Sequence, residues 1–516
     1  MERNLGLFLA KRASITPGLE GLVEVESGRR FTYRELDARA NRLANALLAR
    51  GVDKGDRVAC LMMNGVEYVE TFFALAKIGA VLVPLNWRLV ADELAYILGN
   101  AGARLLLYGA DFAELVETLH RRAARETELT DWIELGGGEH RHPFADDYES
   151  LVAAAPSEPP PIRAGEHDLL FIMYTSGTTG LPKGSMHTHG TFTWAVMSMG
   201  TTAELRFHDR YAVVLPLYHV GALLPVISNV YRGVTNVVLR QFEPGRMWEV
   251  IERERVSVSL LVPAMLNFML QVPEGERRDY SSMRWILSGA TPVPVTLIER
   301  YRVIGIEIHQ AYGLTESGGP ACIISPDDAM KRIGSTGKTF FHNDVRIVDE
   351  TGRDVPPGVP GELIVQAPHV MVGYWRNPEA TAEAIRNGWL YTGDVAIADA
   401  EGFVTIHDRV KDMVISGGEN VYPAEIENVI LRHPAVAEVA VIGQASERWG
   451  ESPFAVVVVK HGERLSEADV LGHCDGKLAR YKRPKGVAFV DEIPRNPTGK
   501  ALKRILRERF PGPAPE

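Results

Sequence analysis

The chain has 516 residues, of which 46% are hydrophobic and 24% are charged, and its formal net charge is −10 at pH 7. This length exceeds one ordinary hydrophobic core, so we expect two or more globular domains. The acidic balance argues against nucleic acid as the main partner.

The N-terminal apolar stretch, residues 5–10, is short and follows Glu2, which is the wrong polarity for a secretion signal. No run in the chain approaches the roughly 18 apolar residues of a membrane-spanning helix. Cys60, Cys322 and Cys474 stand far apart without a C-x-x-C pair, a pattern typical of packed thiols in a reducing compartment. We therefore expect a soluble, cytoplasmic protein.

The next segments alternate helical and strand patterns. Thr32 and Glu35 have the spacing of a capping box, and apolar residues follow at helical intervals, so a helix is predicted there. Residues 57–63 predict a strand, 69–78 a helix and 80–85 a second strand. This order indicates βαβ units and a mostly parallel sheet.

The remaining chain divides into segments with different residue patterns. Residues 135–168, with runs of Gly and Pro, predict a linker between two α/β subdomains. Short strands broken by Gly and Pro then predict a small β-barrel subdomain. The tail predicts a separate α+β domain with helices at 423–431 and after Ser466, and strands at 436–442, 454–459 and 487–490. The expected boundaries are a large domain at 1–410, made of subdomains 1–165, 166–340 and 341–410, and a C-terminal domain at 411–516.

The segment YTSGTTGLPKG, residues 174–184, follows a buried apolar run and is rich in Gly and Thr. Glycine lets backbone N–H groups approach an anion, and hydroxyls add donors, so such a loop can surround phosphate. Its spacing differs from the Walker sequence G-x-x-x-x-G-K-[ST], because Pro182 occupies the second glycine position counted from Gly177. The loop therefore predicts nucleotide binding outside the Walker class.

Further polar clusters lie far from this loop in the sequence. They are LPLYH at 215–219, QAYGLTE at 310–316, YTGD at 391–394 with DRVKD at 408–412, and PRNPTGK at 494–500. Each alone has a structural explanation, such as a core histidine at His219, a helix-capping acid at Glu316 or a solvated Lys500. The basic residues of the tail are likewise explained by a solvated face or by a site for an anionic ligand.

Together, in this order and at these separations, the clusters resemble the AMP-forming adenylating superfamily of acyl-CoA synthetases, peptide-synthetase adenylation domains and luciferases. The resemblance covers essentially the whole chain and is strongest to bacterial fatty-acyl-CoA synthetases. It implies that ATP activates a carboxylate as acyl-adenylate with release of pyrophosphate, and that the acyl group then passes to coenzyme A. A nonenzymatic relic is disfavoured because every motif position retains a chemically competent residue.

The resemblance also implies the roles of individual residues. Mg²⁺ would bind Thr175 and Glu316, a hard cation on oxygen ligands, and Lys500 would bridge the substrate carboxylate and the α-phosphate. The phosphates would lie in the loop, against Thr175, Ser176, Gly177, Thr178, Thr179, Gly180 and Lys183. The adenosine would contact Ala290, His309, Gln310, Ala311, Tyr312, Gly313, Thr315, Asp394 and Arg409, with Tyr312 stacked on adenine and Asp394 on the ribose hydroxyls.

The two half-reactions share one site, so the family rotates its C-terminal domain about a hinge, here at Lys411. Rotation would present Gly417 and Gly418 to the pantetheine of coenzyme A. Candidate contacts for its nucleotide end are Trp449, Tyr481, Arg483 and Lys485.

The acyl pocket is expected to be lined by His219, Val220, Gly221, Ala222, Ser288, Gly289 and Ala311, with His219 near the reacting carboxylate. These positions include no cation, which disfavours an amino acid or a dicarboxylate. Ala311 stands where many relatives have Gly, and its methyl would narrow the pocket. We expect a medium- or long-chain fatty acid as the substrate. The alternatives are an aryl or phenylpropanoid acid:CoA ligase, and an enzyme that delivers the acyl group to a carrier protein. Homodimer formation and peripheral membrane association stay open.

Overall fold

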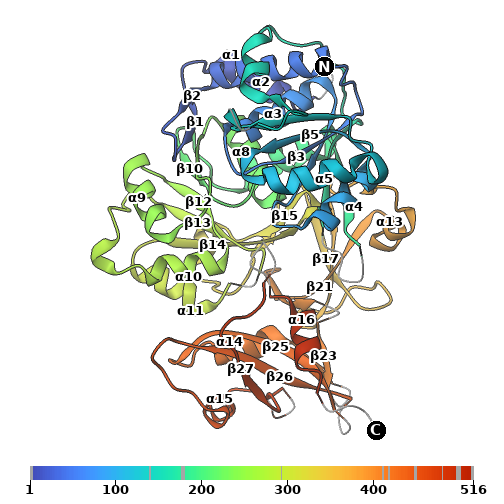
Figure 1. Cartoon of the computed structure of the whole chain (residues 1–516). Helices are drawn as coiled ribbons and strands as arrows, with labels where there is room; N and C mark the ends of the chain where they lie inside the picture. The colour runs from blue at the N-terminus through green and yellow to red at the C-terminus, as the bar shows by residue number, and fades with distance from the viewer. Residues whose placement is uncertain are drawn as a thin grey trace.

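The computed structural model describes residues 4–138, 141–175, 181–291, 293–409, 412–416, 419–446, 450–478, 480, 482–495 and 501–512. Within these ranges the chain forms four sheets. Figure 1 shows a large body, formed by residues up to 409, and below it a smaller C-terminal lobe, residues 412–512. The architecture is the predicted one, an α/β body with an additional small sheet, followed by an α+β lobe.

The first sheet of the body contains the predicted βαβ units. Its strands β3, β4, β5, β6, β7 and β8 pair in parallel, and β9 and β19 extend it in antiparallel pairing. In spatial order the strands are β19 (Gly373–Tyr374), β9 (Lys183–Thr188), β8 (Leu169–Thr175), β4 (Val81–Pro84), β3 (Arg57–Leu61), β5 (Ala103–Gly109), β6 (Asp131–Leu135) and β7 (Asp146–Asp147).

The second sheet has the same character, with a parallel centre and antiparallel edges. In spatial order its strands are β16 (Lys338–Thr339), β15 (Gly319–Ile323), β14 (Glu307–Leu314), β13 (Trp285–Ser288), β12 (Val258–Leu260), β10 (Arg210–Val213), β11 (Thr235–Val238), β1 (Glu20–Glu24) and β2 (Arg30–Thr32).

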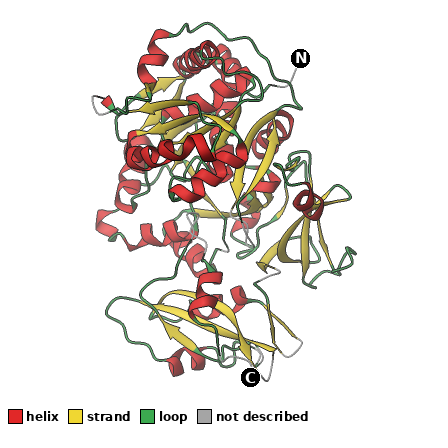
Figure 2. Ribbon diagram, turned by 45° about the vertical axis from the view of Figure 1, so that its right-hand side comes forward, coloured by secondary structure: helices red, strands yellow, loops and turns green. Residues whose placement is uncertain are grey.

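Helices cover both sheets, as Figure 2 shows. Helix α2 begins at the predicted capping box, where Thr32 and Glu35 bond each other's backbone N–H groups. The helices of the body are α1 (Leu7–Ile15), α2 (Tyr33–Ala49), α3 (Val66–Ile78), α4 (Ala91–Ala101), α5 (Ala113–Glu126), α6 (Tyr148–Ala154), α7 (His189–Thr202), α8 (Val220–Arg232), α9 (Pro244–Glu254), α10 (Pro263–Gln271), α11 (Val295–Val303), α12 (Pro326–Ala329) and α13 (Pro378–Ala384). Short 3₁₀ turns are η1 (Ala110–Phe112), η3 (Glu274–Glu276) and η4 (Thr315–Ser317).

The main hydrophobic core is shared by the two large sheets. It joins side chains of β3 and β5 from one sheet and of β10 and β11 from the other, with α2, α3, α7 and α8 among them. Every residue of α3 is buried, which is the pattern of a helix covered on all sides. The sheets are therefore held together by a common core, and this fixes how their strand ends meet.

A third sheet completes the body, and a fourth belongs to the C-terminal lobe. The third consists of β17 (Asp344–Val348), β18 (Gly361–Gln366), β20 (Ile385–Arg386), β21 (Trp389–Ala398) and β22 (Val404–Arg409). The fourth consists of β23 (Val414–Ser416), β24 (Glu419–Val421), β25 (Val436–Ser446), β26 (Gly450–Val459) and β27 (Val487–Phe489). The helices of the lobe are α14 (Pro423–Ile430), α15 (Glu467–His473) and α16 (Lys503–Arg509), and Ser466 caps α15 as predicted.

Two expectations about the body are wrong. The boundary at 165/166 does not separate the two sheets, since β1 and β2 belong to the second sheet while β8 and β9 belong to the first. Residues 135–168 are more than a linker, because they contain β7 and α6. Helix α6 begins where the Asp147 side chain accepts a hydrogen bond from the Ser150 N–H at 2.8 Å, and it buries Tyr148.

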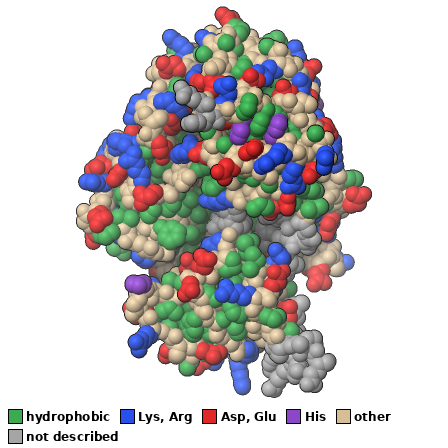
Figure 3. Space-filling model, in the orientation of Figure 1, with side chains coloured by type: hydrophobic (Ala, Val, Ile, Leu, Met, Phe, Trp, Pro, Cys, Tyr) green, Lys and Arg blue, Asp and Glu red, His purple; other side chains and the backbone are tan. Residues whose placement is uncertain are grey.

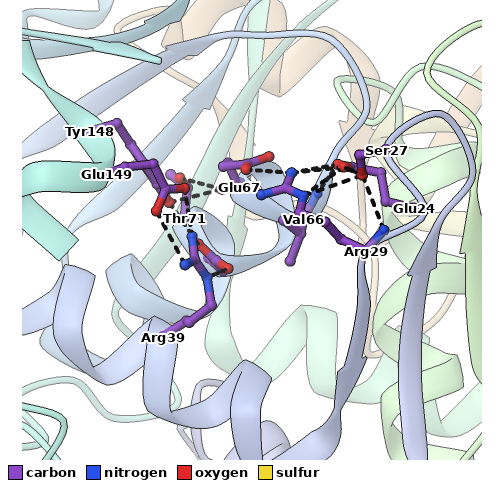
Figure 4. Close-up of polar contacts among 10 residues, drawn as sticks. Glu24, Ser27, Arg29, Arg39, Val66, Glu67, Thr71, Tyr148 and Glu149 are labelled. Carbon is purple, nitrogen blue, oxygen red and sulfur yellow. Dashed lines mark hydrogen bonds and ion pairs between the residues drawn. The ribbon is translucent and has the colours of Figure 1, made fainter. Parts of the chain in front are cut away.

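Ion pairs between partly exposed arginines and the buried carboxylates of Glu67 and Glu70 tie α3 to its neighbours. Arg39 on α2 pairs with Glu70 on α3 and, at 2.8 Å, with Glu149 on α6, while Arg29 beside β2 pairs with Glu67 at 2.7 Å. Figure 4 shows the Arg39 group on the left and the Arg29 group on the right. Burial raises the pKa of Glu70 to about 7, against the opposing effect of Arg39. Removing either arginine would leave a buried carboxylate without this partner, which is destabilising. The intact pairs contribute little net stability, but they hold α3 in one position relative to α2 and β2.

The surface carries both signs of charge. Figure 3 shows Lys and Arg side chains intermingled with Asp and Glu over the body and the C-terminal lobe. Cys60, Cys322 and Cys474 are buried free thiols, as expected from their spacing. Within the described ranges, no helix has the length and apolarity needed to cross a membrane.

Candidate active site

The predicted site residues gather where strands of the two large sheets end. Thr175 is the last residue of β8, and Ser288 is the last residue of β13. His219 lies in the segment between β10 and α8. In open α/β sheets, ligands bind at the carboxyl ends of parallel strands. The fold therefore places Thr175, Ser288 and His219 at or after strand ends of the kind at which ligands bind.

A group of oxygen atoms surrounds the carboxylate of Glu316, which lies in the turn η4. The Thr175 hydroxyl donates to Glu316 Oε1 at 3.2 Å, and the Tyr374 hydroxyl donates to the same atom at 2.9 Å. The Lys183 ammonium lies 5.4 Å from the centre of the Tyr374 ring. Thr175 and Lys183 are paired residues of the β8–β9 hairpin. The arrangement combines anionic and neutral oxygens with a nearby cation, which suits a metal–phosphate complex.

A second polar pair links β14 to the third sheet. The Tyr312 hydroxyl donates to Asp394 Oδ2 at 2.6 Å, although the two residues are 82 positions apart. Both are buried, with exposed fractions of 9% and 7%. Asp394 on β21 is paired with Arg409 on β22, whose side chain lies outside the described part of the chain. The residues predicted for adenine and ribose therefore lie together.

The segment after β13 approaches β14 very closely. A Cβ atom at Gly289 would lie 2.3 Å from the carbonyl oxygen of Ala311, so only glycine fits there. The next residue, Ala290, has a φ of +66°. An alanine in this left-handed region costs on the order of 1 kcal/mol, and such strain is concentrated at functional sites. These backbones are the ones expected to read the adenine edge.

The side chains of the neighbouring β14 residues make structural contacts. The His309 ring stacks on Trp285 with centroids 5.1 Å apart, and its Nε2 lies 3.0 Å from Glu307 Oε2. Burial lowers the pKa of His309. Gln310 donates through Nε2 to the Ser335 carbonyl at 2.9 Å. Contacts of His309 and Gln310 with a nucleotide would therefore use their backbone.

The strand β14 changes partner at the predicted site. It pairs in parallel with β13 up to Gln310 and in antiparallel fashion with β15 from Ala311 onward. The register shifts between Tyr312 and Gly313, and Thr315 then begins η4. Tyr312 and Glu316 therefore lie on either side of this irregular end of β14.

Two residues of the expected acyl pocket, His219 and Ser288, and the neighbouring Tyr218 have buried polar atoms that lack protein partners in the described part of the chain. Within the described ranges, His219 Nε2, Tyr218 Oη and Ser288 Oγ are shielded from solvent and have no hydrogen-bond partner. Buried polar atoms normally have a partner, and these three can still bond a polar group placed beside them. Burial, with a smaller effect of Arg88, lowers the pKa of His219 to about 4, so its ring is neutral at pH 7.

The pocket positions after His219 differ from one another. Apart from its two chain neighbours and the backbone of its own helix, no heavy atom of the described chain lies within 4 Å of the place where a Cβ at Gly221 would stand. Val220 and Ala222, by contrast, are buried in the main core. Of the three positions, Gly221 alone faces open space.

Sequence reasoning missed two residues that contact this site. Tyr374 lies on β19, whose pairing with β9 could not be read from a local pattern. Asn64, which follows β3, is buried and holds the segment before His219. It donates through Nδ2 to the carbonyls of Leu215 at 3.0 Å and Leu239 at 3.2 Å, and it accepts from the Leu217 N–H at 2.9 Å. The signal was a polar residue three positions after the end of a buried strand.

Two residues predicted to contact coenzyme A, Arg483 and Lys485, bond other residues of the C-terminal lobe. Arg483 pairs with Asp475, and Lys485 donates to the Arg480 carbonyl at 3.2 Å. Burial and the positive charges of Arg480 and Arg483 lower the pKa of Lys485. Outside the described residues lie Ser176, Gly177, Thr178, Thr179, Gly180, Lys411, Gly417, Gly418, Trp449, Tyr481 and Lys500.

The sequence profile described as "AMP-binding enzyme" matches residues 9–375 of this chain. The chain belongs to this family. The profile of the AMP-binding enzyme C-terminal domain matches residues 425–500. The long-chain-fatty-acid–CoA ligase FadD13 of Mycobacterium tuberculosis is 43% identical over 514 residues, which is 100% of each chain. The feruloyl-CoA synthase of an Amycolatopsis species is 40% identical over 509 residues, 98% of this chain and 99% of the relative.

The fold comparison agrees. The crystal structure of the anthranilate CoA ligase AuaEII in complex with anthranoyl-AMP superposes with a TM-score of 0.92 at 28% identity, covering 99% of this chain and 97% of the other. The predicted superfamily, fold class and enzyme class are thus confirmed: this AMP-binding enzyme is an AMP-forming carboxylic acid:CoA ligase, which uses ATP and coenzyme A. The acids named for these relatives differ, so the comparisons fix the reaction class rather than the acid.

Proposed function

We propose that the chain is an ATP-dependent acyl-CoA synthetase whose acid is a medium- or long-chain fatty acid. The observation that carries the choice of acid is the open space at Gly221, directly after His219. A flexible chain that starts at His219 could pass this point without a side chain in its way. The 43% identity to a long-chain-fatty-acid–CoA ligase supports the same choice.

The chemistry places a definite demand on the site. A carboxylate must approach the negatively charged α-phosphate of ATP, so charge has to be neutralised and the reactants aligned. Thr175 and Glu316 offer oxygen ligands 3.2 Å apart, a donor set that fits Mg²⁺. Bound there, the ion would neutralise phosphate charge. Lys183 would add a second positive charge beside the phosphates, together with the loop from Ser176 to Gly180.

The nucleoside would occupy the opposite end of the site. Tyr312 would stack on adenine, and the backbone at Ala290 and from His309 to Ala311 would read its edge. Asp394 would accept both ribose hydroxyls, and it would then exchange its hydrogen bond with Tyr312 for bonds to the ribose. Arg409, on the paired strand, would reach the ribose or a phosphate.

Adenylation and thioester formation would use different orientations of the C-terminal domain. Lys500 would bridge the acid and the α-phosphate in the first step and leave during rotation about Lys411. Gly417 and Gly418 would then border the path of the coenzyme A thiol. Arg483 and Lys485 are the proposed contacts of its nucleotide end, with Trp449 and Tyr481.

A comparison of acids tests the proposal. The assay measures kcat/KM for octanoate, palmitate, benzoate and ferulate under one set of conditions, following AMP and thioester together. We expect octanoate and palmitate to exceed both aryl acids. A higher value for benzoate or ferulate would overturn the fatty-acid assignment while leaving the ligase reaction intact.

A substitution at Gly221 tests the path of the chain. Gly221→Phe should obstruct a long acyl chain, whereas Gly221→Ala serves as the matched control because a methyl fits the open space. Each methylene that loses its burial costs about 0.8 kcal/mol, so two displaced methylenes reduce kcat/KM roughly tenfold. We expect the loss for palmitate to exceed that for octanoate. An unchanged chain-length profile in Gly221→Phe would place the acyl path elsewhere.

The alternative acid class has its own support. The feruloyl-CoA synthase is 40% identical, and the anthranilate CoA ligase has the same fold. A flat ring would also fit beside Gly221, which makes the four-acid comparison decisive between the classes. Delivery to a carrier protein is the remaining alternative, and it predicts transfer to a phosphopantetheinylated carrier in preference to free coenzyme A.

A further inference from the structure

The turn that carries Glu316 is held at each of its carbonyl groups. In η4, the Thr315 carbonyl lies 2.9 Å from His187 Nε2, and the Glu316 carbonyl accepts from the Met371 N–H at 2.8 Å. The Ser317 carbonyl contacts His369 Nδ1. The residues on both sides of Glu316 are thus fixed by histidine rings, and Glu316 itself is fixed by backbone.

The two histidines come from the segments that also contact the Glu316 carboxylate. His187 lies on β9, whose partner β8 supplies Thr175. His369 precedes β19, which supplies Tyr374 and also pairs with β9. The turn is therefore linked through its backbone to the same elements that its carboxylate reaches through hydrogen bonds. A shift of the turn would change both sets of contacts together.

The contacts indicate which ring nitrogen donates to the turn. A carbonyl oxygen only accepts, so His187 donates to the turn through Nε2 and His369 donates to it through Nδ1. The other nitrogens face side chains: His187 Nδ1 lies 3.5 Å from the Thr191 hydroxyl, and His369 Nε2 contacts Asn343 Oδ1, which also only accepts. A neutral His369 ring donates to one of its two oxygen neighbours at a time, and it holds the turn when the hydrogen is on Nδ1. His187 and His369 are 0% and 1% exposed, so water does not replace these bonds.

Gly318 allows the His187 ring and the His369 backbone to pack closely against the turn. Its φ is +70°, and a Cβ atom there would lie 2.6 Å from the His369 carbonyl and 3.0 Å from His187 Cε1. Any larger residue would therefore displace the backbone of His369, the ring of His187, or both. The close packing leaves the turn little freedom to move.

We propose that His187 and His369 are positioning residues for Glu316, which hold η4 so that its carboxylate faces Thr175 and Tyr374. They act through the backbone of the turn and do not touch the nucleotide. The inference rests on the proposed role of Glu316 as a Mg²⁺ ligand. It predicts that the two rings determine how strongly ATP binding depends on the metal.

The test exploits the different nitrogen used by each ring. An Asn side chain places its NH₂ as far along the side chain as Nδ1, and a Gln places it as far as Nε2. His369→Asn and His187→Gln therefore keep the donor, whereas His369→Gln and His187→Asn misplace it. Glu316→Gln is the reference variant for the metal ligand.

The measurement is equilibrium binding of ATP by titration calorimetry, with Mg²⁺ and then with EDTA, in the absence of acid so that no turnover occurs. One lost hydrogen bond corresponds to roughly fivefold in an equilibrium constant. We expect His369→Gln and His187→Asn to weaken Mg²⁺-ATP binding by about this factor and to leave binding in EDTA unchanged. The donor-keeping variants should bind like the wild type.

The outcomes separate this inference from the proposed function. If Glu316→Gln keeps the full preference for Mg²⁺-ATP, the assigned role of Glu316 fails. If Glu316→Gln loses that preference but the donor-misplacing variants keep it, the positioning role is refuted. If all the histidine variants lose ATP affinity equally with Mg²⁺ and with EDTA, the rings contribute only to general packing. That result would also refute the positioning role.

Discussion

Replacing Asn64 by Leu tests whether the segment before His219 is held from the other sheet. Leu has a similar size, but it removes two donated hydrogen bonds, to the Leu215 and Leu239 carbonyls, and the acceptor for the Leu217 N–H. A net hydrogen bond contributes about 1 kcal/mol, and a buried unpaired group costs about 1–3 kcal/mol. We therefore expect the free energy of unfolding of the body to fall by roughly 2–4 kcal/mol.

The functional effect of Asn64→Leu should be selective. The substitution releases the segment that leads to His219. KM for the acid should therefore rise several-fold, because on the order of 1 kcal/mol of binding free energy is lost when His219 is no longer held in place. KM for ATP should stay near the wild-type value. The assay combines urea unfolding with steady-state kinetics in each substrate.

Asn41→Leu is the matched control for this experiment. Asn41 is also buried, and its side chain accepts a hydrogen bond from Lys77 and donates one to the Ser157 carbonyl. It lies on α2, away from the site. It should destabilise the body without changing KM for the acid. Our reasoning would be refuted if both variants raised KM for the acid equally, or if Asn64→Leu left it unchanged.

The remaining predictions address the steps and the pH range. Lys500→Ala should nearly abolish adenylation but still convert synthetic acyl-adenylate to thioester; equal losses in both half-reactions would contradict the role of Lys500. Lys411→Pro, which restricts the backbone, should spare acid-dependent pyrophosphate exchange and block thioester formation, and survival of both rates would contradict the rotation. Burial lowers the pKa of His189 to about 4. The folded state therefore binds fewer protons than the unfolded state between pH 4 and 6.5, and stability falls as the pH drops through this window, by on the order of 3 kcal/mol. His219 contributes in the same way, because burial also lowers its pKa to about 4. His189→Asn should therefore remove only the His189 share of this dependence in unfolding experiments at pH 4.5 and 7, and a dependence as large as that of the wild type would contradict the His189 contribution.

Local patterns predicted the elements whose signals lie within a few residues. The capping box at Thr32 and Glu35, the cap at Ser466 and the alternation around β3, α3 and β4 are all present. In these cases the backbone donors of a helix end are bonded by residues near in sequence, or the spacing of apolar residues within the segment itself indicates the element.

The errors concern partners that are distant in sequence. Nothing in β1 indicates that it pairs with β11 more than two hundred residues later (Leu22 with Asn236, for example), so the boundary at 165/166 was wrong. The same reason hid Tyr374 and His369, whose contacts with the Glu316 turn depend on the placement of β19. The family resemblance implied that Tyr312 and Asp394 bind one nucleotide, but only the fold shows their hydrogen bond at 2.6 Å.

The central claim is that this AMP-binding enzyme activates a fatty acid as its adenylate before coenzyme A reacts. The most direct measurement is a rapid chemical quench with α-labelled ATP, Mg²⁺ and palmitate, first without coenzyme A and then after its addition. The account predicts that palmitoyl-AMP accumulates to about one equivalent per active site, and that added coenzyme A converts it to palmitoyl-CoA and AMP. Formation of ADP, or of thioester without a preceding acyl-adenylate, would contradict it.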